Sequence, residues 1–266
     1  MRRAHEPPRS RALRIVIVGT GTGVGKTFVA CALLSQWSER AQVAGLKPVE
    51  TGVGSGLQRP TRSLRARGAE ASGSAAPDQE RLTGAAGVFH VKQRQGDRRR
   101  GRAQMPLLRS LYAFPDPISP HLAARRAGVR IDLGLIDRWV RDHEAPMTII
   151  ETAGGLFSPL GHGATNFELT QALQPHAVVL VAPDRLGVLH ELTTTLALAA
   201  ARGGPPLGVV LSTPAKKDAS TGYNATELSA LGITQPLAVF PRASARASVT
   251  AEAARRIIAW IENDGG

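Results

Sequence analysis

Short apolar runs alternate along the chain with longer segments in which apolar residues recur every three or four positions. The short runs are rich in β-branched residues, which is typical of buried strands, and the longer segments are typical of amphipathic helices. The predicted strands are 14–18, 43–46, 147–150, 177–181, 207–211 and 237–240. The predicted helices are 26–38, 132–143, 167–173, 189–201, 226–231 and 251–261. This alternation predicts an α/β fold, with a parallel sheet and helices on both faces.

Two stretches interrupt this pattern. Residues 54–75 and 92–104 are rich in Gly, Ser, Ala, Arg and Gln and have few periodic apolar positions, so we expect irregular Arg-rich insertions there. Residues 1–13 form a basic tail that we expect to be disordered. Residues 14–266 are predicted to form a single domain, which fits the length of the chain.

Composition and charge narrow the possible functions. The chain has 266 residues, is 42% hydrophobic and carries a net charge of +12, most of it in the tail and the Arg-rich insertions. Since this charge does not map onto the predicted sheet and helices, we expect no specific nucleic-acid partner. The apolar runs are too short to span a membrane, and no apolar signal region follows the tail. A single cysteine, Cys31, excludes an internal disulfide and suits the cytoplasm, which is the expected location.

A glycine-rich loop carries the strongest chemical signal. Residues 19–27 read Gly-Thr-Gly-Thr-Gly-Val-Gly-Lys-Thr and connect the first strand to the first helix. Backbone N–H groups of such a loop surround phosphate oxygens, and the helix N-terminus favours the same anion. Lys26 is expected to reach the β- and γ-phosphates and Thr27 to bind Mg²⁺. The sequence therefore predicts a fold of the P-loop NTPase-like class, with a loop one residue longer than the usual form.

Two further strands end in charged residues. Lys47 follows the second strand in the run Lys-Pro-Val-Glu-Thr-Gly, and Glu151 closes the strand 147–150 before Thr-Ala-Gly-Gly. The carboxyl ends of parallel strands meet at one edge of a sheet. Lys47 is either a ligand of the γ-phosphate or a solvated lysine before a turn. Glu151 fits a metal ligand better than an acid that caps a turn.

The segment 112–121 contains four residues that stiffen or shape a loop: three prolines and Ser119. We interpret it as a rigid loop that either contributes its aromatic residues and Ser119 to a substrate pocket or serves only as a connector. The histidines show no metal-ligand spacing, and no Ser-His-Asp or Cys-His nucleophile arrangement is recognisable. Asn166 is expected to cap the helix 167–173.

In this order, the motifs resemble those of the dethiobiotin synthetase family. The resemblance rests on the long phosphate loop with Thr22, the run 47–52, the Asp-Pro-Ile-Ser-Pro-His segment at 116–121, Glu151 with its glycines, and Phe240-Pro241 at a strand end. The resemblance implies closure of the ureido ring of dethiobiotin from 7,8-diaminopelargonic acid, CO₂ and ATP, with Mg²⁺. A carbamate and a carbamic–phosphoric mixed anhydride would be intermediates. It also implies a homodimer with the active site at its interface.

The resemblance assigns residues position by position. Nucleotide binding is implied for Gly23, Val24, Gly25, Lys26, Thr27, Phe28, Asp78, Glu151, Thr152, Ala153, Gly154, Ser212, Thr213, Pro241, Arg242 and Ala243. Substrate binding is implied for Thr22, Lys47, Thr51, Ser119, Leu186, Gly187 and Val188, the last three from the neighbouring subunit. Metal binding is implied for Thr27, Asp78 and Glu151, and catalytic roles for Lys47, Lys26 and Thr22.

Departures from the family pattern bear on the nucleotide site. Gly23 replaces a frequent glutamate, and Ser212-Thr213 replaces the Asn-Asp pair that usually reads the base. The alternatives are an amidoligase of the cobyrinate diamide synthase type, an ATPase switch of the partitioning or septum-site type, and a non-catalytic nucleotide-binding module in which Lys47 and Glu151 would be incidental. The first needs a glutaminase domain, for which the chain has no room. The second carries an extra lysine near the start of its loop, where this chain has Thr20, Gly21 and Thr22.

Overall fold

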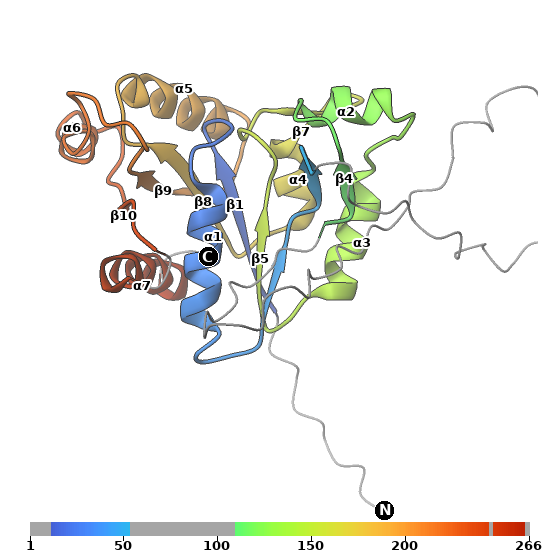
Figure 1. Cartoon of the computed structure of the whole chain (residues 1–266), viewed down its shortest axis with the longest axis horizontal. Coiled ribbons are helices and arrows are strands. Elements are labelled where there is room, and N and C mark those ends of the chain that lie inside the picture. The colour runs from blue at the N-terminus through green and yellow to red at the C-terminus, as the bar shows by residue number, and fades with distance from the viewer. Residues whose placement is uncertain (1–11, 54–109, 245–246, 264–266) are drawn as a thin grey trace, which may run out of the picture.

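The computed structural model describes residues 12–53, 110–244 and 247–263. Its central sheet contains six parallel strands in the order β10-β9-β8-β1-β5-β2, as Figure 1 shows. The strand bounds are β1 Leu13–Gly19, β2 Val43–Leu46, β5 Met147–Glu151, β8 Ala177–Pro183, β9 Leu207–Ser212 and β10 Ala238–Phe240. Each predicted strand is present, so the predicted parallel sheet is confirmed.

Both faces of this sheet are covered, as the apolar composition of its strands requires. Along β1, Ile15 and Ile17 pack into one hydrophobic cluster, whereas Val16 and Val18 pack into another on the opposite face. Every residue of β8 is buried. The alternation of side chains along each strand thus divides the core into two halves.

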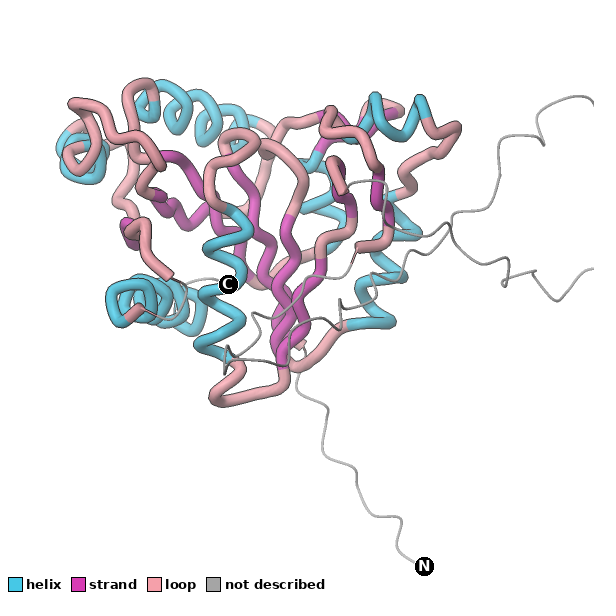
Figure 2. Tube along the Cα trace, viewed as in Figure 1, coloured by secondary structure: helices cyan, strands magenta, loops and turns pink. Residues whose placement is uncertain are grey.

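Helices from different parts of the chain complete each half (Figure 1), and Figure 2 shows these helices around the central strands. α1 (Lys26–Trp37) and α7 (Ser248–Asn263) supply the cluster that contains Ile15. The opposite cluster receives side chains from α2 (Pro120–Arg126), α3 (Leu133–His143), α4 (Asn166–Leu173), α5 (Val188–Ala201) and α6 (Asn224–Ala230). Among the described residues, no helix is both long and apolar enough to cross a membrane.

The structure corrects the prediction that residues 112–121 form a loop. Tyr112–Phe114 is strand β4, which pairs in parallel with β3 (Val49–Thr51). Helix α2 begins at Pro120, directly after the predicted loop residue Ser119. The two paired strands are far apart in the sequence, so no local pattern could reveal the pairing. The antiparallel hairpin of β6 (Pro159–Gly161) and β7 (Ala164–Thr165) was likewise not predicted.

The cap of α4 is a second correction. Thr165 is the N-cap residue, and it forms a capping box with Glu168. Asn166 is the first helical residue and is completely buried. Its side chain donates hydrogen bonds to the loop that follows β5 instead of capping the helix.

The topology brings the predicted site residues to one edge of the sheet. β1 lies between β8 and β5, and the chain crosses to opposite sides of β1 as it builds the two halves of the sheet. In open parallel sheets, ligands bind beyond the carboxyl ends of the strands at such a reversal point. The loop that follows β1 occupies that position.

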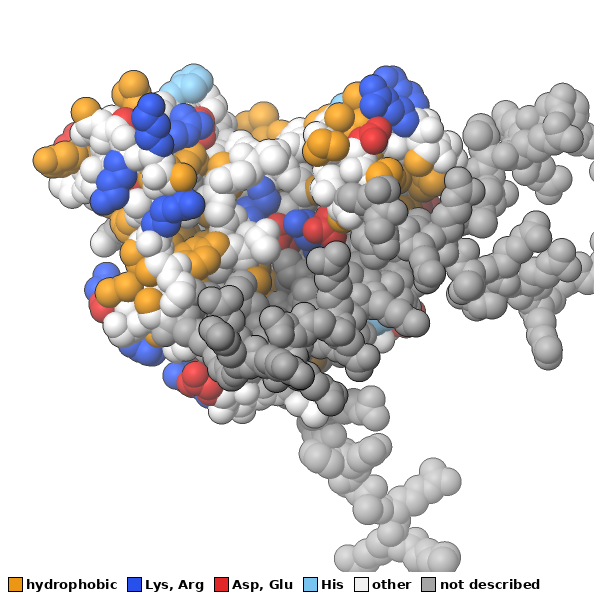
Figure 3. All heavy atoms as spheres, viewed as in Figure 1, with side chains coloured by type: hydrophobic (Ala, Val, Ile, Leu, Met, Phe, Trp, Pro, Cys, Tyr) orange, Lys and Arg blue, Asp and Glu red, His pale blue; other side chains and the backbone are white. Residues whose placement is uncertain are grey.

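The Arg-rich insertions and nearly all of the basic tail lie outside the described residues, although β1 begins at Leu13, the last residue assigned to the tail. On the face drawn in Figure 3, described Lys and Arg side chains lie in separate groups. One group covers α2, where Arg125 and Arg126 are exposed.

Candidate active site

The phosphate loop connects β1 to α1 and ends at a helix start whose backbone N–H groups have no side-chain cap. Gly25, the N-cap residue of α1, has a φ of 100° and offers no side-chain cap, so the first N–H groups of α1 are left for another partner. A Cβ at Gly25 would lie 2.5 Å from the Ser212 Oγ, so this position also requires the smallest residue for steric reasons. A helix start with free backbone N–H groups of this kind is suited to bind an anion.

The Lys26 side chain folds back onto this loop. Its Nζ donates a hydrogen bond to the Gly21 carbonyl at 2.7 Å, and the residue is buried. Burial lowers the pKa of Lys26 to about 8, an effect that the Glu151 carboxylate opposes and the Lys47 ammonium reinforces. A cation in this position needs an anionic partner, and a triphosphate in the loop would supply one.

Glu151 contacts one residue on α1 and another that follows β2. Its Oε1 accepts a hydrogen bond from the Thr27 hydroxyl at 2.8 Å and lies 3.1 Å from Lys47 Nζ. These residues meet because β5 pairs with β1 on one side and with β2 on the other. Burial alone would lower the pKa of Lys47, but the Glu151 and Glu50 carboxylates outweigh it and raise that pKa above its ordinary value. Lys47 is therefore an ion-paired residue of the site and not a solvated lysine.

The residues around Glu151 fit a divalent cation. Glu151 is buried, and its Oε2 has no hydrogen-bond partner among the described residues. A carboxylate oxygen and a hydroxyl are hard oxygen donors of the kind that Mg²⁺ prefers. Asp78, the third predicted metal ligand, lies outside the described residues. The described part of the chain contains no group of three or more His, Cys, Asp or Glu residues arranged to hold a metal ion.

A pocket of about 550 Å³ opens beside this cluster. It is lined by the substrate-pocket candidates Thr22, Lys47, Thr51 and Ser119, and by the nucleotide-site candidates Gly23, Gly25, Lys26, Thr27, Phe28, Glu151, Thr152, Ala153 and Gly154. Sequence reasoning missed four further lining residues, Pro117, Ile118, Pro120 and Ser158. The segment from 117 to 120 connects β4 to α2, which carries Ser119 to the pocket.

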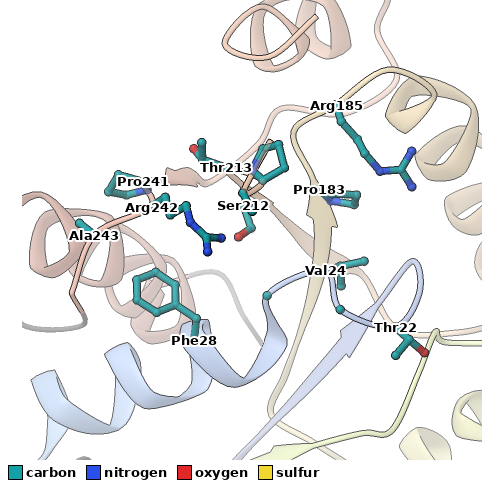
Figure 4. A pocket seen from close by; sticks show the side chains of 14 residues that line it. Thr22, Val24, Phe28, Pro183, Arg185, Ser212, Thr213, Pro241, Arg242 and Ala243 are labelled. Atoms are coloured by element: carbon teal, nitrogen blue, oxygen red, sulfur yellow. The ribbon is translucent and has the colours of Figure 1, made fainter. Parts of the chain in front are cut away.

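A second pocket of about 600 Å³ continues from the first past the phosphate loop (Figure 4). It is lined by Thr22, Gly23, Val24, Gly25, Phe28, Ser212, Thr213, Pro241, Arg242 and Ala243, all of which were predicted to bind nucleotide or substrate. Sequence reasoning missed Pro183, Arg185, Pro214 and Ala215 in the same lining. The Phe28 ring packs edge-on against Phe240 at a centroid distance of 5.9 Å, which fixes an apolar wall.

Asn166 holds the loop that follows Glu151. Its Nδ2 donates hydrogen bonds to the carbonyls of Ala153 at 2.7 Å and Gly155 at 2.8 Å. Gly155 passes so close to the phosphate loop that a Cβ there would lie 2.9 Å from the Thr20 carbonyl. The sequence carried a signal for this role. Thr165 can cap α4 by itself, so the neighbouring Asn166 is left to form other hydrogen bonds.

The start of α5 does not line either pocket in this single chain. Leu186 is 73% exposed, and its backbone N–H donates to Asp218 Oδ2 at 2.8 Å. Arg185 forms an ion pair with Glu191 at 2.6 Å, and Glu191 also accepts from the Thr20 hydroxyl at 2.9 Å. The structure thus links the phosphate loop to α5 but leaves Leu186, Gly187 and Val188 apart from the other predicted substrate residues.

Comparisons with known proteins identify the family and the fold. A family described as AAA domain matches residues 13–76 and 98–263. The chain is 34% identical over 190 residues to the ATP-dependent dethiobiotin synthetase of Nitrosospira multiformis, covering 70% of each chain. It is 32% identical to that of Anaeromyxobacter dehalogenans, covering 85% of this chain and 89% of the relative. For Rhodococcus erythropolis the identity is 33%, with 88% and 90% covered.

Solved structures with similar folds come from other proteins. The septum site-determining protein MinD of Pyrococcus horikoshii, complexed with Mg-ADP, has a TM-score of 0.52 and 14% identity, covering 96% of this chain and 98% of its own. A putative plasmid partition protein of Borrelia burgdorferi bound to AMPPNP has a TM-score of 0.53 and 10% identity, covering 95% and 99%. At such identities the likeness shows the P-loop NTPase-like fold alone. The sequence relatives favour the predicted family over a partitioning-type switch or an amidoligase.

Proposed function

Because the chain belongs to the ATP-dependent dethiobiotin synthetase family, we propose that its two connected pockets close the ureido ring of dethiobiotin from 7,8-diaminopelargonic acid, CO₂ and ATP. The enzyme is an ATP-dependent cyclo-ligase of biotin biosynthesis. One observation carries the proposal: Lys26, Lys47, Thr27 and Glu151 lie together in the lining of the pocket of about 550 Å³, beside the phosphate-loop residues Thr22, Gly23 and Gly25 that line both pockets. Phosphoryl transfer between ligands in the two pockets needs cationic groups next to the phosphate loop.

The pocket of about 600 Å³ is the proposed nucleotide site. The phosphate loop and the start of α1 would bind the phosphates, and the nucleoside would lie between Phe28, Ser212 and Arg242. The pocket of about 550 Å³ is the proposed site for the diamine, with Thr22, Thr51 and Ser119 in its wall. This arrangement would direct the γ-phosphate toward the diamine, since Lys26 and Thr27 line the diamine pocket.

The proposed reaction needs no covalent enzyme intermediate. One amine of the substrate forms a C–N bond with CO₂, loses a proton to solvent and becomes a carbamate. A carbamate oxygen attacks the γ-phosphorus, the bond to the β-phosphate oxygen breaks, and ADP leaves. The second amine then attacks the carbonyl carbon of the mixed anhydride, releasing phosphate and a proton as the ring closes. Lys26 and Lys47 would stabilise negative charge on the transferring phosphoryl group.

Magnesium is proposed as the metal of this site. Thr27 and Glu151 would hold it, because the Thr27 hydroxyl and the unpartnered Glu151 Oε2 are adjacent hard oxygen donors. Bound there, the ion would neutralise charge on the β- and γ-phosphates. Asp78 stays a sequence-based candidate for a third ligand.

We also propose that the enzyme is a cytoplasmic homodimer whose active site is completed by the partner. The support is the family resemblance and the position of the α5 start, which is exposed and outside both pockets of the single chain. Leu186, Gly187 and Val188 would then offer backbone groups to the carboxylate of the partner's substrate. Because the Leu186 N–H already donates to Asp218, a bound carboxylate would have to displace that contact.

The proposal is tested by incorporation of labelled bicarbonate. Purified protein with ATP, Mg²⁺ and diaminopelargonic acid is expected to form labelled dethiobiotin and one phosphate for each ring closed. Omitting the diamine, the ATP or the Mg²⁺ is expected to abolish the labelled product. ATP hydrolysis without labelled product would overturn the proposed substrate pair, and light scattering of the same preparation measures whether it is a dimer.

A further inference from the structure

A second carboxylate contacts the ammonium group of Lys47. Glu50 Oε1 lies 3.5 Å from Lys47 Nζ, and Glu151 Oε1 lies 3.1 Å from the same atom. Glu50 belongs to β3, whereas Glu151 ends β5. Lys47 is therefore held between acids from two different sheets.

The Glu50 carboxylate is itself fixed on its far side. Its Oε2 accepts a hydrogen bond from the Ser110 hydroxyl at 2.9 Å, and Ser110 is 2% exposed. The pairing of β3 with β4 holds the backbone on either side, with Glu50 opposite Ala113. One Glu50 oxygen thus contacts a buried anchor and the other contacts Lys47.

Glu50 has no place among the described residues that line the two pockets. Its contacts are Lys47 and Ser110, so it can influence the reaction only through Lys47. The other partner of Lys47, Glu151, also accepts from Thr27 through the same Oε1. If Glu50 were absent, the flexible four-carbon stem of Lys47 would be free to settle on Glu151 alone. That shift would move the ammonium and neutralise the carboxylate that faces Thr27.

We propose that Glu50, anchored by Ser110, is a positioning residue that holds the Lys47 ammonium where it can meet the transferring phosphoryl group. The inference rests on the proposed function. It assigns to the strand pair β3–β4 the task of orienting a cation, in addition to carrying Thr51 and Ser119 toward the substrate pocket. Glu50 itself does not touch the substrate or the nucleotide.

The test compares three variants in the labelled-bicarbonate assay. Glu50→Gln keeps the shape and an acceptor for Ser110 but loses the charge, so kcat is expected to fall about tenfold, or about 1.4 kcal/mol. Ser110→Ala keeps the charge and frees the carboxylate, so a smaller loss of about threefold is expected. When Lys47 is already alanine, Glu50→Gln is expected to cause no further loss, because the effect passes through Lys47.

A second readout needs no turnover and no metal. ATP binding measured by calorimetry without Mg²⁺ is expected to be unchanged in Glu50→Gln, because Glu50 is not among the described residues that line either pocket. A merely structural defect would weaken it. Glu252→Gln is the matched control, since it removes an exposed ion pair with Arg256 on α7, far along the chain from the site; its kcat is expected to equal that of the wild type.

The outcomes separate this inference from the proposed function. Absence of ring closure by the wild-type enzyme overturns both. Ring closure by the wild type with an unchanged kcat in Glu50→Gln overturns the positioning role alone, as does a full further loss in the Lys47→Ala background. If Glu50→Gln fails to fold, Ser110→Ala and its combination with Lys47→Ala carry the same comparison.

Discussion

At the residue scale, two lysines from different elements line the same pocket. Lys26 starts α1 and donates to the phosphate loop, whereas Lys47 follows β2 and pairs with Glu151. The position of Lys26 above the loop suits binding of the ground-state nucleotide. Lys47 contacts Glu151, one of the metal candidates, which suits a contact that strengthens as phosphoryl transfer proceeds.

Replacing each lysine by alanine separates these roles. Lys26→Ala is expected to weaken ATP binding and kcat together. Lys47→Ala is expected to lower kcat by a factor that corresponds to about 2.7–4 kcal/mol while changing the ATP dissociation constant little. Calorimetry and single-turnover kinetics measure the two quantities. Near wild-type turnover by Lys47→Ala would rule out its catalytic role.

The base pocket supports a second prediction at this scale. Ser212 and Thr213 offer hydroxyl groups where a side-chain amide would both donate and accept, and the described lining contains no Asn, Gln, Asp or Glu. A site without such paired contacts discriminates weakly between bases. GTP or CTP is therefore expected to support ring closure within about tenfold of ATP, or about 1.4 kcal/mol. Comparing kcat/KM for four nucleoside triphosphates checks this, and a hundredfold preference for ATP would assign base selection to backbone groups.

At the scale of elements, α4 supports the loop that follows β5. Asn166 is the first residue of α4, and its two hydrogen bonds reach carbonyls on either side of Gly154. The loop lines the substrate pocket and touches the phosphate loop through Gly155. The position of α4 therefore controls the shape of a pocket to which none of its own side chains contributes in the described lining.

Asn166→Ala tests this support. It removes two buried hydrogen bonds and leaves two carbonyls without their donor, so unfolding is expected to become easier by about 2 kcal/mol, with a raised KM for both ATP and the diamine. Thr170→Val is the control, because it removes a buried hydroxyl that donates to the Asn166 carbonyl within the same helix. This control should lose stability but keep its KM values. Equal KM changes in both variants would contradict the role of the Asn166 side chain.

At the scale of the whole molecule, the core on the α1–α7 side of the sheet isolates the single cysteine. Cys31 lies in α1 and is 4% exposed. The residues beside it in this helix pack against β1 and α7. Burial raises the pKa of its thiol to about 11; the Glu151 charge adds to this effect and Lys47 opposes it. Because the thiolate is the reactive form, a raised pKa lowers the reactive fraction at pH 8.

The rate at which Cys31 is alkylated should consequently measure unfolding of the whole domain. At pH 8 the thiolate fraction falls to about one in a thousand from about one in four for an ordinary thiol, so iodoacetamide is expected to react at least 100-fold more slowly with the folded protein. The labelling rate, followed by mass spectrometry across a urea titration, should rise together with the loss of helical circular dichroism. Rapid labelling of fully active protein would contradict the rigid packing of α1.

Predictability differed between the fold and the site. Alternating runs predicted all six strands of the main sheet because each is a short, buried and locally apolar segment. The phosphate loop was recognisable because its chemistry lies in consecutive residues. Strand β4 was missed because Tyr112–Phe114 becomes a strand only by pairing with Val49–Thr51.

The sequence by itself therefore determined the α/β class, the phosphate loop and the family, since these depend on local periodicity and on contiguous motifs. Only the tertiary structure decided which side chains meet. Strand order places Lys47 and Glu151 3.1 Å apart. A hydrogen bond between segments 60 residues apart joins Ser110 to Glu50, and the Asn166 side chain holds the 153–155 loop in place of capping α4. The physical reason is that contacts between distant segments are fixed by packing of the whole core, which no short window of sequence contains.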